Sequence, residues 1–376
     1  ALGIESDKEI LNYIISDADN PNNEKYLDLL RYSILDANYI FSQTEALEYL
    51  SRFVEYYNEK DKENGIDNLK YILTNDFLPN VGDGFNNKAY FLGHLIKKFI
   101  DVKLGINPPT NRDNYLFKRV DLSGYMLSNL FRDFYNKFRR NILNTIDRQY
   151  YYGDWRNNKN IELLINNVNI SQIFDSNIIK NGMIDSFKGN WGQENDPQKS
   201  SYVQDLERLS YLSYLSHVRR INTPMDRSIK FLEPRKLAGT QYGSVCPVDS
   251  PDGPNIGLIK HFSIMTSVTY DINVDNIINC LIDNGMIELP DISTKDINNS
   301  IKIFINNNWI GIHFEPEYIY KVLITFRRVG IIDNTISISW YIQNYELKIL
   351  ADAGRFYRPL YIVNDNKLLL DDSKLI

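Results

Sequence analysis

Cysteine and histidine are scarce in this sequence of 376 residues. Two cysteines, Cys246 and Cys280, cannot build a disulfide framework or a four-thiolate zinc site. The histidines show no short metal-ligand spacing, and each is expected to be structural or exposed: His94, His217, His261 and His313. This shortage excludes a small disulfide-rich domain and fits a reducing compartment.

Long apolar runs are absent as well. No stretch approaches the ~20 apolar residues of a membrane span, so no membrane partner is expected. The opening residues, "ALGIESDKEI", have neither the basic nor the apolar region of a signal peptide. Because the chain starts at alanine and stops at "LLLDDSKLI", we expect a fragment of a longer protein.

Positive charge is in deficit overall, with a net charge of −6, but it is not evenly spread. Residues 116–148 contain seven Lys/Arg and three Asp, and residues 217–260 contain seven Lys/Arg and four Asp/Glu. Basic faces of this kind can hold a polyanion, because screening limits electrostatic attraction to roughly 8–10 Å. They can equally be solvated helix faces, and composition alone leaves both interpretations open.

Apolar spacing predicts an α+β multidomain fold. Helical periodicity marks 8–17, 26–35, 44–60, 88–105, 121–149 and 202–220, which gives a mainly helical first part. The helix over 121–149 is expected to bury a stripe made of Leu127, Leu130, Phe131, Phe134, Phe138 and Leu143. From residue 264 onward short β-like runs at 264–272, 301–314 and 335–342 surround a helical pattern at 316–330. These runs predict a small α+β module at the end of the chain.

The stretch "GTQYGSVCPVDSPDGPNIGLIKHF", residues 239–262, suits neither helix nor strand. It holds three prolines and four glycines, so it should form a stiff, tightly turned segment, which we call the bend. Asp249 and Asp252 could pair as metal ligands, but no third acidic ligand is near in sequence. A surface turn explains them better, because Asp-Gly is a common turn dipeptide. The bend is therefore interpreted as a shaped surface for a large ligand.

The segment "CPVDSPDGPNIGLIKHFSIM" resembles the signature C-P-x-E-T-P-E-G-x-x-x-G-L of the second-largest, β-like subunit of multisubunit DNA-directed RNA polymerases. Other motifs follow in that family's order, among them "FKRVDLSGYML", "LSHVRRINTP", "TFRRVGII" and "ADAGRFYRPLYIV". The resemblance covers residues 8–363 and is stronger to the eukaryotic and archaeal branch. The family's two glutamates are replaced by Asp249 and Asp252, its threonine by Ser250, and its usual histidines by "AGTQ". This drift resembles a polymerase of a large nucleocytoplasmic DNA virus; a divergent protist stays open.

The resemblance implies a division of the chain into named segments. Residues 1–182 would be the lobe, 183–217 part of the protrusion and 218–266 the fork region. Residues 267–363 would be an external-1-like module, and 364–376 the start of a truncated following region.

The implied function is that of a fragment of the polymerase's second-largest subunit, which helps form the DNA cleft and fork beside the active centre during transcription. The complete complex would be a nucleotidyltransferase, and this fragment alone would be inactive. Mg²⁺ would act in the complete enzyme with its ligands on the largest subunit, so no catalytic or metal residue is expected here. Partners would be the largest and other polymerase subunits, DNA template, RNA transcript and NTP. The place of action would be the nucleus, or a cytoplasmic viral factory or virion.

Matching positions of the family's fork give the candidate site residues. Those expected near nucleic acid or nucleotide are Arg219, Arg220, Arg227, Arg235 and Lys236. Those expected to shape the bend are Pro247, Asp249, Pro251, Asp252, Gly253 and Gly257. For Arg219 and Arg220, a structural role at the helix end and a role in phosphate binding are equally expected. Arg355 and Arg358 are expected to be structural or to lie at a subunit contact. A non-catalytic nucleic-acid-binding or assembly module on the same scaffold is the alternative function, and a metal-dependent nuclease built on the two aspartates is a third.

Overall fold

The computed structural model describes residues 1–17, 20, 23–37, 39–54, 65–153, 164–167, 169–192, 202–226, 228–293, 296–364 and 366–368. The chain forms two compact units, each made of two segments: 1–111 with 270–352, and 112–269 with 353–376. Both contain helices and strands, which confirms the expected α+β multidomain class. The units divide the chain at other places than the segments named after the family, and those segment boundaries stay predictions. No helix in the described part of the chain is both long and apolar enough to cross a membrane.

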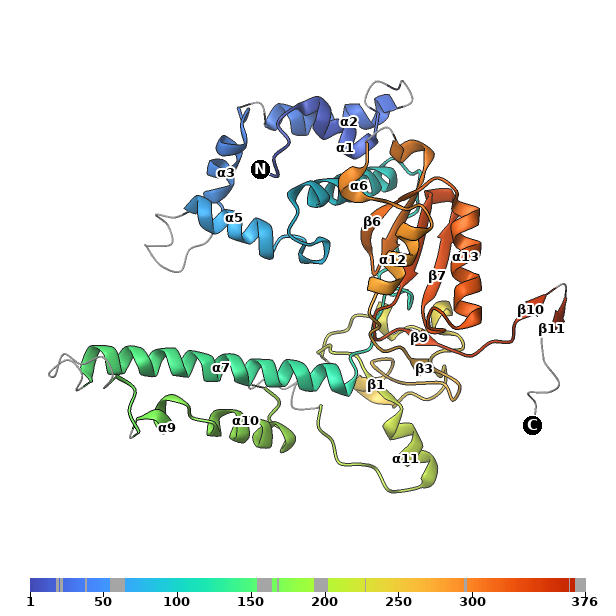
Figure 1. Ribbon diagram of the computed structural model, residues 1–376. Helices are drawn as coiled ribbons and strands as arrows, with labels where there is room; N and C mark the ends of the chain where they lie inside the picture. Colours follow the sequence, from blue (N-terminus) through green and yellow to red (C-terminus); the bar gives the residue numbers. More distant parts are fainter. Residues whose placement is uncertain are drawn as a thin grey trace. The chain divides into compact units, whose positions relative to one another are not determined.

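The first unit begins with helices that are coloured blue to cyan in Figure 1. They are α1 (Asp7–Ile15), α2 (Glu24–Asp36), α3 (Gln43–Ser51), α5 (Gly65–Asn75), the 3₁₀ turn η2 (Pro79–Val81) and α6 (Phe85–Lys103). Helix α3 begins where the Ser42 side chain accepts a hydrogen bond from the backbone N–H of Glu45, and residues 55–60 of the longer helix expected there lie outside the described residues. In α6, Ala89, Tyr90, Phe91 and Ile100 are buried, so this helix contributes more buried hydrophobic residues than any other described helix of residues 1–111.

A five-stranded sheet forms the centre of the first unit, in the order β4-β6-β5-β8-β7. Its elements are α12 (Asp275–Asp283), β4 (Ile287–Glu288), η8 (Leu289–Asp291), η9 (Asp296–Asn299), β5 (Ile301–Ile305), β6 (Asn308–His313), α13 (Pro316–Val329), β7 (Ser337–Tyr341), η10 (Ile342–Asn344) and β8 (Glu346–Leu350). Strands β5 and β8 are parallel, and the other pairs are antiparallel. Asn306 and Asn307 join β5 to β6 with φ of 49° and 64°, and asparagine tolerates the left-handed conformation that such a two-residue turn requires.

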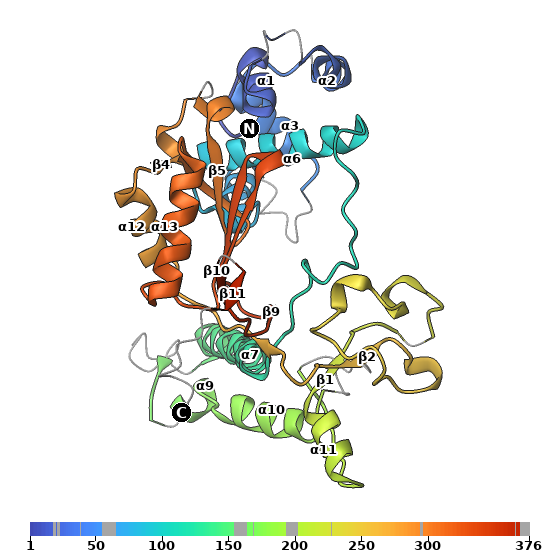
Figure 2. The same ribbon diagram turned by 90° about the vertical axis from the view of Figure 1, so that its right-hand side faces the viewer.

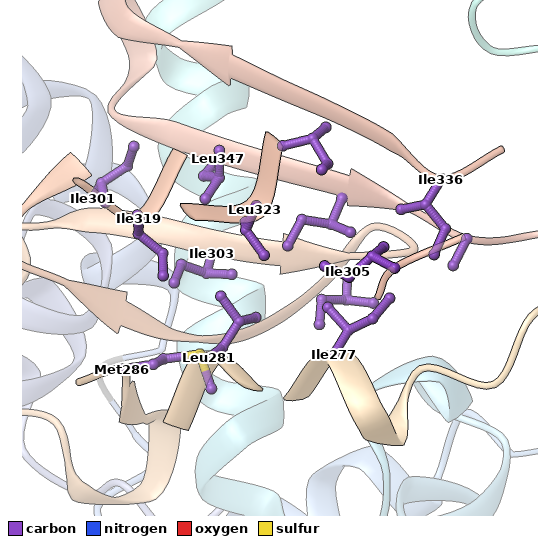
Figure 3. Packing of buried hydrophobic residues seen from close by; sticks show 14 residues of the cluster. Ile277, Leu281, Met286, Ile301, Ile303, Ile305, Ile319, Leu323, Ile336 and Leu347 are labelled. Carbon is purple, nitrogen blue, oxygen red and sulfur yellow. The ribbon is translucent and has the colours of Figure 1, made fainter. Parts of the chain in front are cut away.

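The two faces of this sheet bury different sets of side chains. Ile301, Ile303 and Ile305 of β5 point to one face, where α12 and α13 pack against them in the core that Figure 3 shows. Figure 2 has α12 and α13 on the same side of the sheet. Phe304, between two of these isoleucines, packs with Trp309 and with Tyr90 of α6 on the other face. Side chains alternate between the two faces of a strand, so β5 packs against α12 and α13 with one face and against α6 with the other. The second contact joins residues 1–111 to residues 270–352.

A buried ionic cluster lies between α6 and the sheet. The carboxylate of Glu346, 1% exposed, lies 2.8 Å from Lys98 Nζ, 3.1 Å from Lys348 Nζ and 3.4 Å from His94 Nε2. Lys302 Nζ donates to His94 Nδ1 over 3.2 Å. Burial lowers the pKa of His94 to about 4, so its imidazole is neutral at pH 7. Burial alone would raise the pKa of Glu346, but the hydrogen bond from His94 and the charges of Lys98 and Lys348 hold it well below its usual range.

The second unit contains a helical hairpin. It consists of the long helix α7 (Ser123–Tyr152), with α9 (Ile170–Ile173) and α10 (Asn177–Phe187) running beside it in Figure 1. The expected long helix is confirmed, but its buried stripe is narrower than predicted. Leu130 and Phe134 are buried, whereas Phe131 and Leu143 are 50% and 56% exposed. Leu127 and Phe138 are half-buried, so the predicted stripe is covered in part and is exposed at Phe131 and Leu143.

The rest of the second unit is built from short elements around the bend. They are α11 (Tyr211–Val218), β1 (Arg220–Asn222), η5 (Glu233–Arg235), η6 (Gly239–Gln241), η7 (Gly253–Asn255), β2 (Ile259–His261), β3 (Ser267–Val268), β9 (Phe356–Tyr357), β10 (Val363–Asn364) and β11 (Lys367–Leu368). Strand β1 pairs antiparallel with β2, and β3 with β9. The sequence predicted a helix over 202–220, which is wrong in its first half. The helix begins at Tyr211, because Ser210 and Ser213 form a capping box there.

Candidate nucleic-acid interface

The bend is held in shape by its own backbone turns. Two 3₁₀ turns, η6 and η7, are separated by an isolated β-bridge between Val245 and Phe262. Pro254 lies in the first turn of η7, where a missing N–H costs nothing. Pro247 is exposed and Pro251 is half-buried, and Gly253 has a φ of 76°. The predicted stiff, tightly turned segment is therefore present.

Gly257 allows the closest backbone approach in the bend. Its φ is 71°, and a Cβ built on it would lie 2.3 Å from the backbone oxygen of Arg235. Arg235 in turn donates from one guanidinium nitrogen to the carbonyl oxygens of Pro254 (2.6 Å) and Ile256 (3.0 Å), and from the other to Ile229 (3.3 Å). Arg235 therefore ties the segment around η5 to the bend through backbone oxygens.

Arg219 performs a similar task at the end of α11. Its guanidinium donates to the carbonyl oxygen of Phe262 at 3.3 Å, to that of Ser263, and to those of Ile264 and Thr266 at 3.3 Å each. A guanidinium has five N–H donors in a fixed plane, which suits one turn of backbone carbonyls. The side chain is half-buried. Its observed contacts are internal, and its predicted proximity to nucleic acid stays a prediction.

The other predicted cations differ in their surroundings. Arg220 lies 3.6 Å from Glu207 and donates to Gln204 over 3.4 Å. Lys236 is exposed and pairs with Glu233 at 2.6 Å, a pair in water that adds little stability. Arg227 lies outside the described residues. The basic fork residues thus form pairs and clamps, and only Lys236 among the described ones is fully on the surface.

Asp249 fixes the bend to α11. Its carboxylate accepts from Ser216 Oγ at 2.8 Å and lies 3.2 Å from Nδ1 of the buried His261. The carboxylate of Asp252 stands exposed just before η7 and makes no capping bond to that turn. The described residues contain no group of three His, Cys, Asp or Glu side chains that could hold a metal ion. The donor set around the two aspartates therefore does not fit a magnesium site, and the described part of the chain offers no third ligand for the nuclease hypothesis.

The partners of two cations were not foreseen from the sequence. Lys260, 8% exposed, donates to the hydroxyl of Tyr115 (2.8 Å) and the carbonyl of Pro234 (3.2 Å), and burial lowers the pKa of this lysine. Arg358 donates to the carbonyl oxygen of Gly243 over 3.2 Å. Lys260 and Arg358 both belong to motifs that the sequence analysis quoted. Their partners Tyr115 and Gly243 are more than a hundred residues away in sequence, and no local pattern predicts such a contact.

A second group of cations faces solvent on α7. Lys137, Arg139 and Arg140 are exposed, and the rings of Phe131 and Tyr135 on the same helix stack with centroids 6.2 Å apart. These residues belong to the basic window 116–148. Taken together, the second unit presents a stiff bend with internal cation clamps and a helix with free cationic surface. A rigid surface with nearby positive charge can fix the position of a polyanion without performing chemistry on it.

Comparison with known proteins places these elements in a family. The family model "RNA polymerase Rpb2, domain 2" matches residues 1–121, domain 3 matches 204–268 and domain 4 matches 303–364. The three models follow in order and together cover well over half of the chain. The domain 3 model contains α11, β1, β2 and the whole bend.

Comparison of the chain with individual proteins gives the same result. The chain is 35% identical over 376 residues to DNA-directed RNA polymerase II subunit 2 of Arabidopsis thaliana, which covers 98% of this chain and 30% of that protein. It is 27% identical to DNA-directed RNA polymerase subunit Rpo2 of Sulfolobus acidocaldarius (100% and 32%) and 29% identical to DNA-directed RNA polymerase subunit 2 of Acanthamoeba polyphaga mimivirus (98% and 32%). The chain thus spans about a third of the length of the curated relatives it matches. It belongs to the family of second-largest subunits of DNA-directed RNA polymerase, of which it carries domains 2, 3 and 4.

Proposed function

We propose that this chain forms part of the DNA cleft of a DNA-directed RNA polymerase, with the bend as one wall beside the active centre. The observation that carries the proposal is the bend itself: Arg219 and Arg235 donate to its backbone oxygens from two other segments, and Lys260 of the bend donates to the carbonyl oxygen of Pro234. Such cross-linking keeps the shape of the surface constant when a large ligand passes over it. The complete assembly would extend RNA on a DNA template from NTPs, and this chain alone would be inactive.

Magnesium would be held elsewhere in the complete enzyme. Nucleotidyl transfer needs metal ions beside the reacting phosphate, and the described residues present no suitable ligand set. The proposal therefore assigns the metal to the largest subunit. This chain would contribute by positioning: it would hold the DNA template in place and keep the template out of orientations that do not allow reaction. This assignment makes the largest subunit, and through it the other polymerase subunits, the partners of the chain in the nucleus, or in a viral factory or virion.

Nucleic-acid binding is tested with the 376-residue chain and a fluorescein-labelled forked DNA. We expect the logarithm of the affinity to fall linearly with the logarithm of salt concentration, by about 0.7 to 0.9 per neutralised phosphate. Exchanging Arg139 and Arg140 for glutamine should flatten this slope, because both are exposed cations of α7. A parent chain without salt-dependent binding would contradict the proposal.

Assembly is tested separately, by capturing the tagged chain from its source cell. Recovery of the largest polymerase subunit is expected. The alternative, a nucleic-acid-binding or assembly module that reuses the scaffold, predicts DNA binding without the largest subunit.

A further inference from the structure

Tyr242 is an exposed aromatic residue on an immobilised backbone. Its side chain is 90% exposed, although large aromatic rings are normally well covered. The carbonyl oxygen of the next residue, Gly243, accepts hydrogen bonds from Ser263 Oγ (2.7 Å), Thr266 Oγ1 (3.2 Å) and Arg358 (3.2 Å). The ring is therefore presented to solvent from a fixed point, which removes part of the entropy cost of binding a flat ligand.

Arg358 lies directly beside this ring-bearing turn. Gly243 has a φ of 81°, which favours glycine, and a Cβ built on it would lie 2.6 Å from Nη1 of Arg358, so the guanidinium packs against the bare backbone of this residue. The side chain of Arg358 is exposed, and its one described bond uses one of five N–H donors. In the described part of the chain no carboxylate forms an ion pair with it. An arginine with donors facing water can bind a phosphate through two parallel hydrogen bonds.

We propose that Tyr242 and Arg358 bind one unpaired nucleotide of a single-stranded nucleic acid. The Tyr242 ring stacks on the base, and the Arg358 guanidinium binds the adjoining phosphate. Every base has an aromatic face, so the site accepts any sequence. This inference rests on the proposed function and deepens it, because it names the form of nucleic acid that the bend contacts and the two residues that contact it.

A protein partner is the competing occupant. Ile264, which follows Ser263, is 89% exposed and would suit an apolar protein surface. The unneutralised guanidinium favours the nucleotide, because a phosphate supplies its counter-charge and a base supplies the flat face that the ring needs. The two occupants make different demands on Tyr242 and Arg358, which an experiment can separate.

The test uses the 376-residue chain and an oligothymidylate with one central 2-aminopurine, read by quenching and by anisotropy. Tyr242→Ala should weaken binding by roughly five- to 150-fold, the range for loss of one base–aromatic stack, and should abolish the quenching. Tyr242→Phe and Tyr242→Trp should retain both signals. Tyr39→Ala, which removes a tyrosine 87% exposed in the other unit, is the matched control and should change neither.

Arg358 is tested through salt dependence. Arg358→Ala should reduce the salt slope by about 0.7, the value for one phosphate of a single strand, and Arg358→Lys should restore it. Unchanged binding and quenching in Tyr242→Ala, with a parent chain that binds, would overturn the inference and leave the proposed function standing. Loss of captured polymerase subunits with unchanged oligonucleotide binding would also overturn it and assign the patch to a protein. Absence of salt-dependent binding by the parent would instead contradict the proposed function itself.

Discussion

Lys302 Nζ lies 3.2 Å from His94 Nδ1, and this contact fixes the protonation of the imidazole. A lysine ammonium can only donate, so Nδ1 must accept, and the single proton of the neutral ring is on Nε2. That proton faces Glu346, whose oxygen is 3.4 Å away. The pKa of His94, lowered by burial to about 4, agrees with a neutral ring at pH 7.

The first prediction concerns acid sensitivity of the first unit. The unfolded chain takes up a proton on His94 below its ordinary pKa of 6.5, whereas the folded chain does not until about pH 4. The contribution of neutral His94 to the free energy of unfolding is therefore fully present above pH 6.5. It is lost as pH is lowered toward 4, by on the order of 3 kcal/mol. His94→Gln should flatten the curve of unfolding free energy against pH in this window, as measured by urea unfolding. An equally steep curve in the variant would show that other groups cause the loss.

A second prediction concerns Gly257. Alanine at this position meets a backbone oxygen at 2.3 Å and a φ of 71°, so Gly257→Ala should destabilise the second unit by at least about 2 kcal/mol. Gly239→Ala is the matched control in the same bend, because a Cβ there meets nothing within 4 Å. Thermal unfolding distinguishes them. Equal melting temperatures for both variants would contradict the close approach.

A third prediction separates clamping from phosphate binding at Arg219. Arg219→Gln removes charged donors from four carbonyl oxygens and should cost about 1.5 to 3 kcal/mol of unfolding free energy. The salt slope of DNA binding should stay at the parental value, since these donors face the protein. A slope reduced by one phosphate, with normal stability, would instead support the nucleic-acid role that the sequence predicted.

A fourth prediction distinguishes the two aspartates of the bend. Asp249→Ala deletes the acceptor of Ser216 and the partner of His261, and should lower the melting temperature. Asp252→Ala deletes an exposed carboxylate and should leave it unchanged. Neither variant should alter magnesium-dependent cleavage of DNA. Loss of a cleavage activity present in the parent would revive the nuclease hypothesis.

A fifth prediction addresses the core of the sheet. Ile303 is fully buried against α12 and α13, so Ile303→Ala should cost about 2 to 5 kcal/mol through lost burial and a residual cavity. Ile282→Ala removes the same atoms from a side chain 38% exposed and should cost less than half as much. Chemical denaturation measures both. Similar losses would mean that the core relaxes around the missing atoms.

Sequence patterns predicted the local elements best. The helix α13 is bounded by Pro316 at its start and Gly330, with a φ of 88°, directly after its end, and both signals are readable as letters. The run 301–314 was predicted as β-like, and the structure divides it into β5 and β6 at the turn of Asn306 and Asn307. The bend was recognised from its prolines and glycines, because those residues restrict or extend backbone freedom wherever they stand.

Long-range relationships could not be predicted in the same way. Arginines at fork positions were expected near nucleic acid, with a structural role equally open for Arg219. The structure adds what the sequence did not show, that Arg219 and Arg235 donate to backbone carbonyl oxygens, and their proximity to nucleic acid stays a prediction. A sequence shows a charge and not the partner that satisfies it. The residues 202–210 carry helical apolar spacing and remain non-helical, because the cap at Ser210 competes with continuation of the helix. Leu209, 92% exposed, shows that spacing alone does not bury a side chain.

The first unit draws its two halves from segments that residues 112–269 separate. Tyr90 of α6 donates to the carbonyl oxygen of Ile292, and neither half can complete this bond while the other is unmade. At a ribosomal speed of about 5 to 20 residues per second, the early helices wait roughly ten to thirty seconds for the strands that cover them. During this interval their apolar faces are open to chaperones and to aggregation, so translation speed through the intervening segment should govern the yield of correctly folded protein.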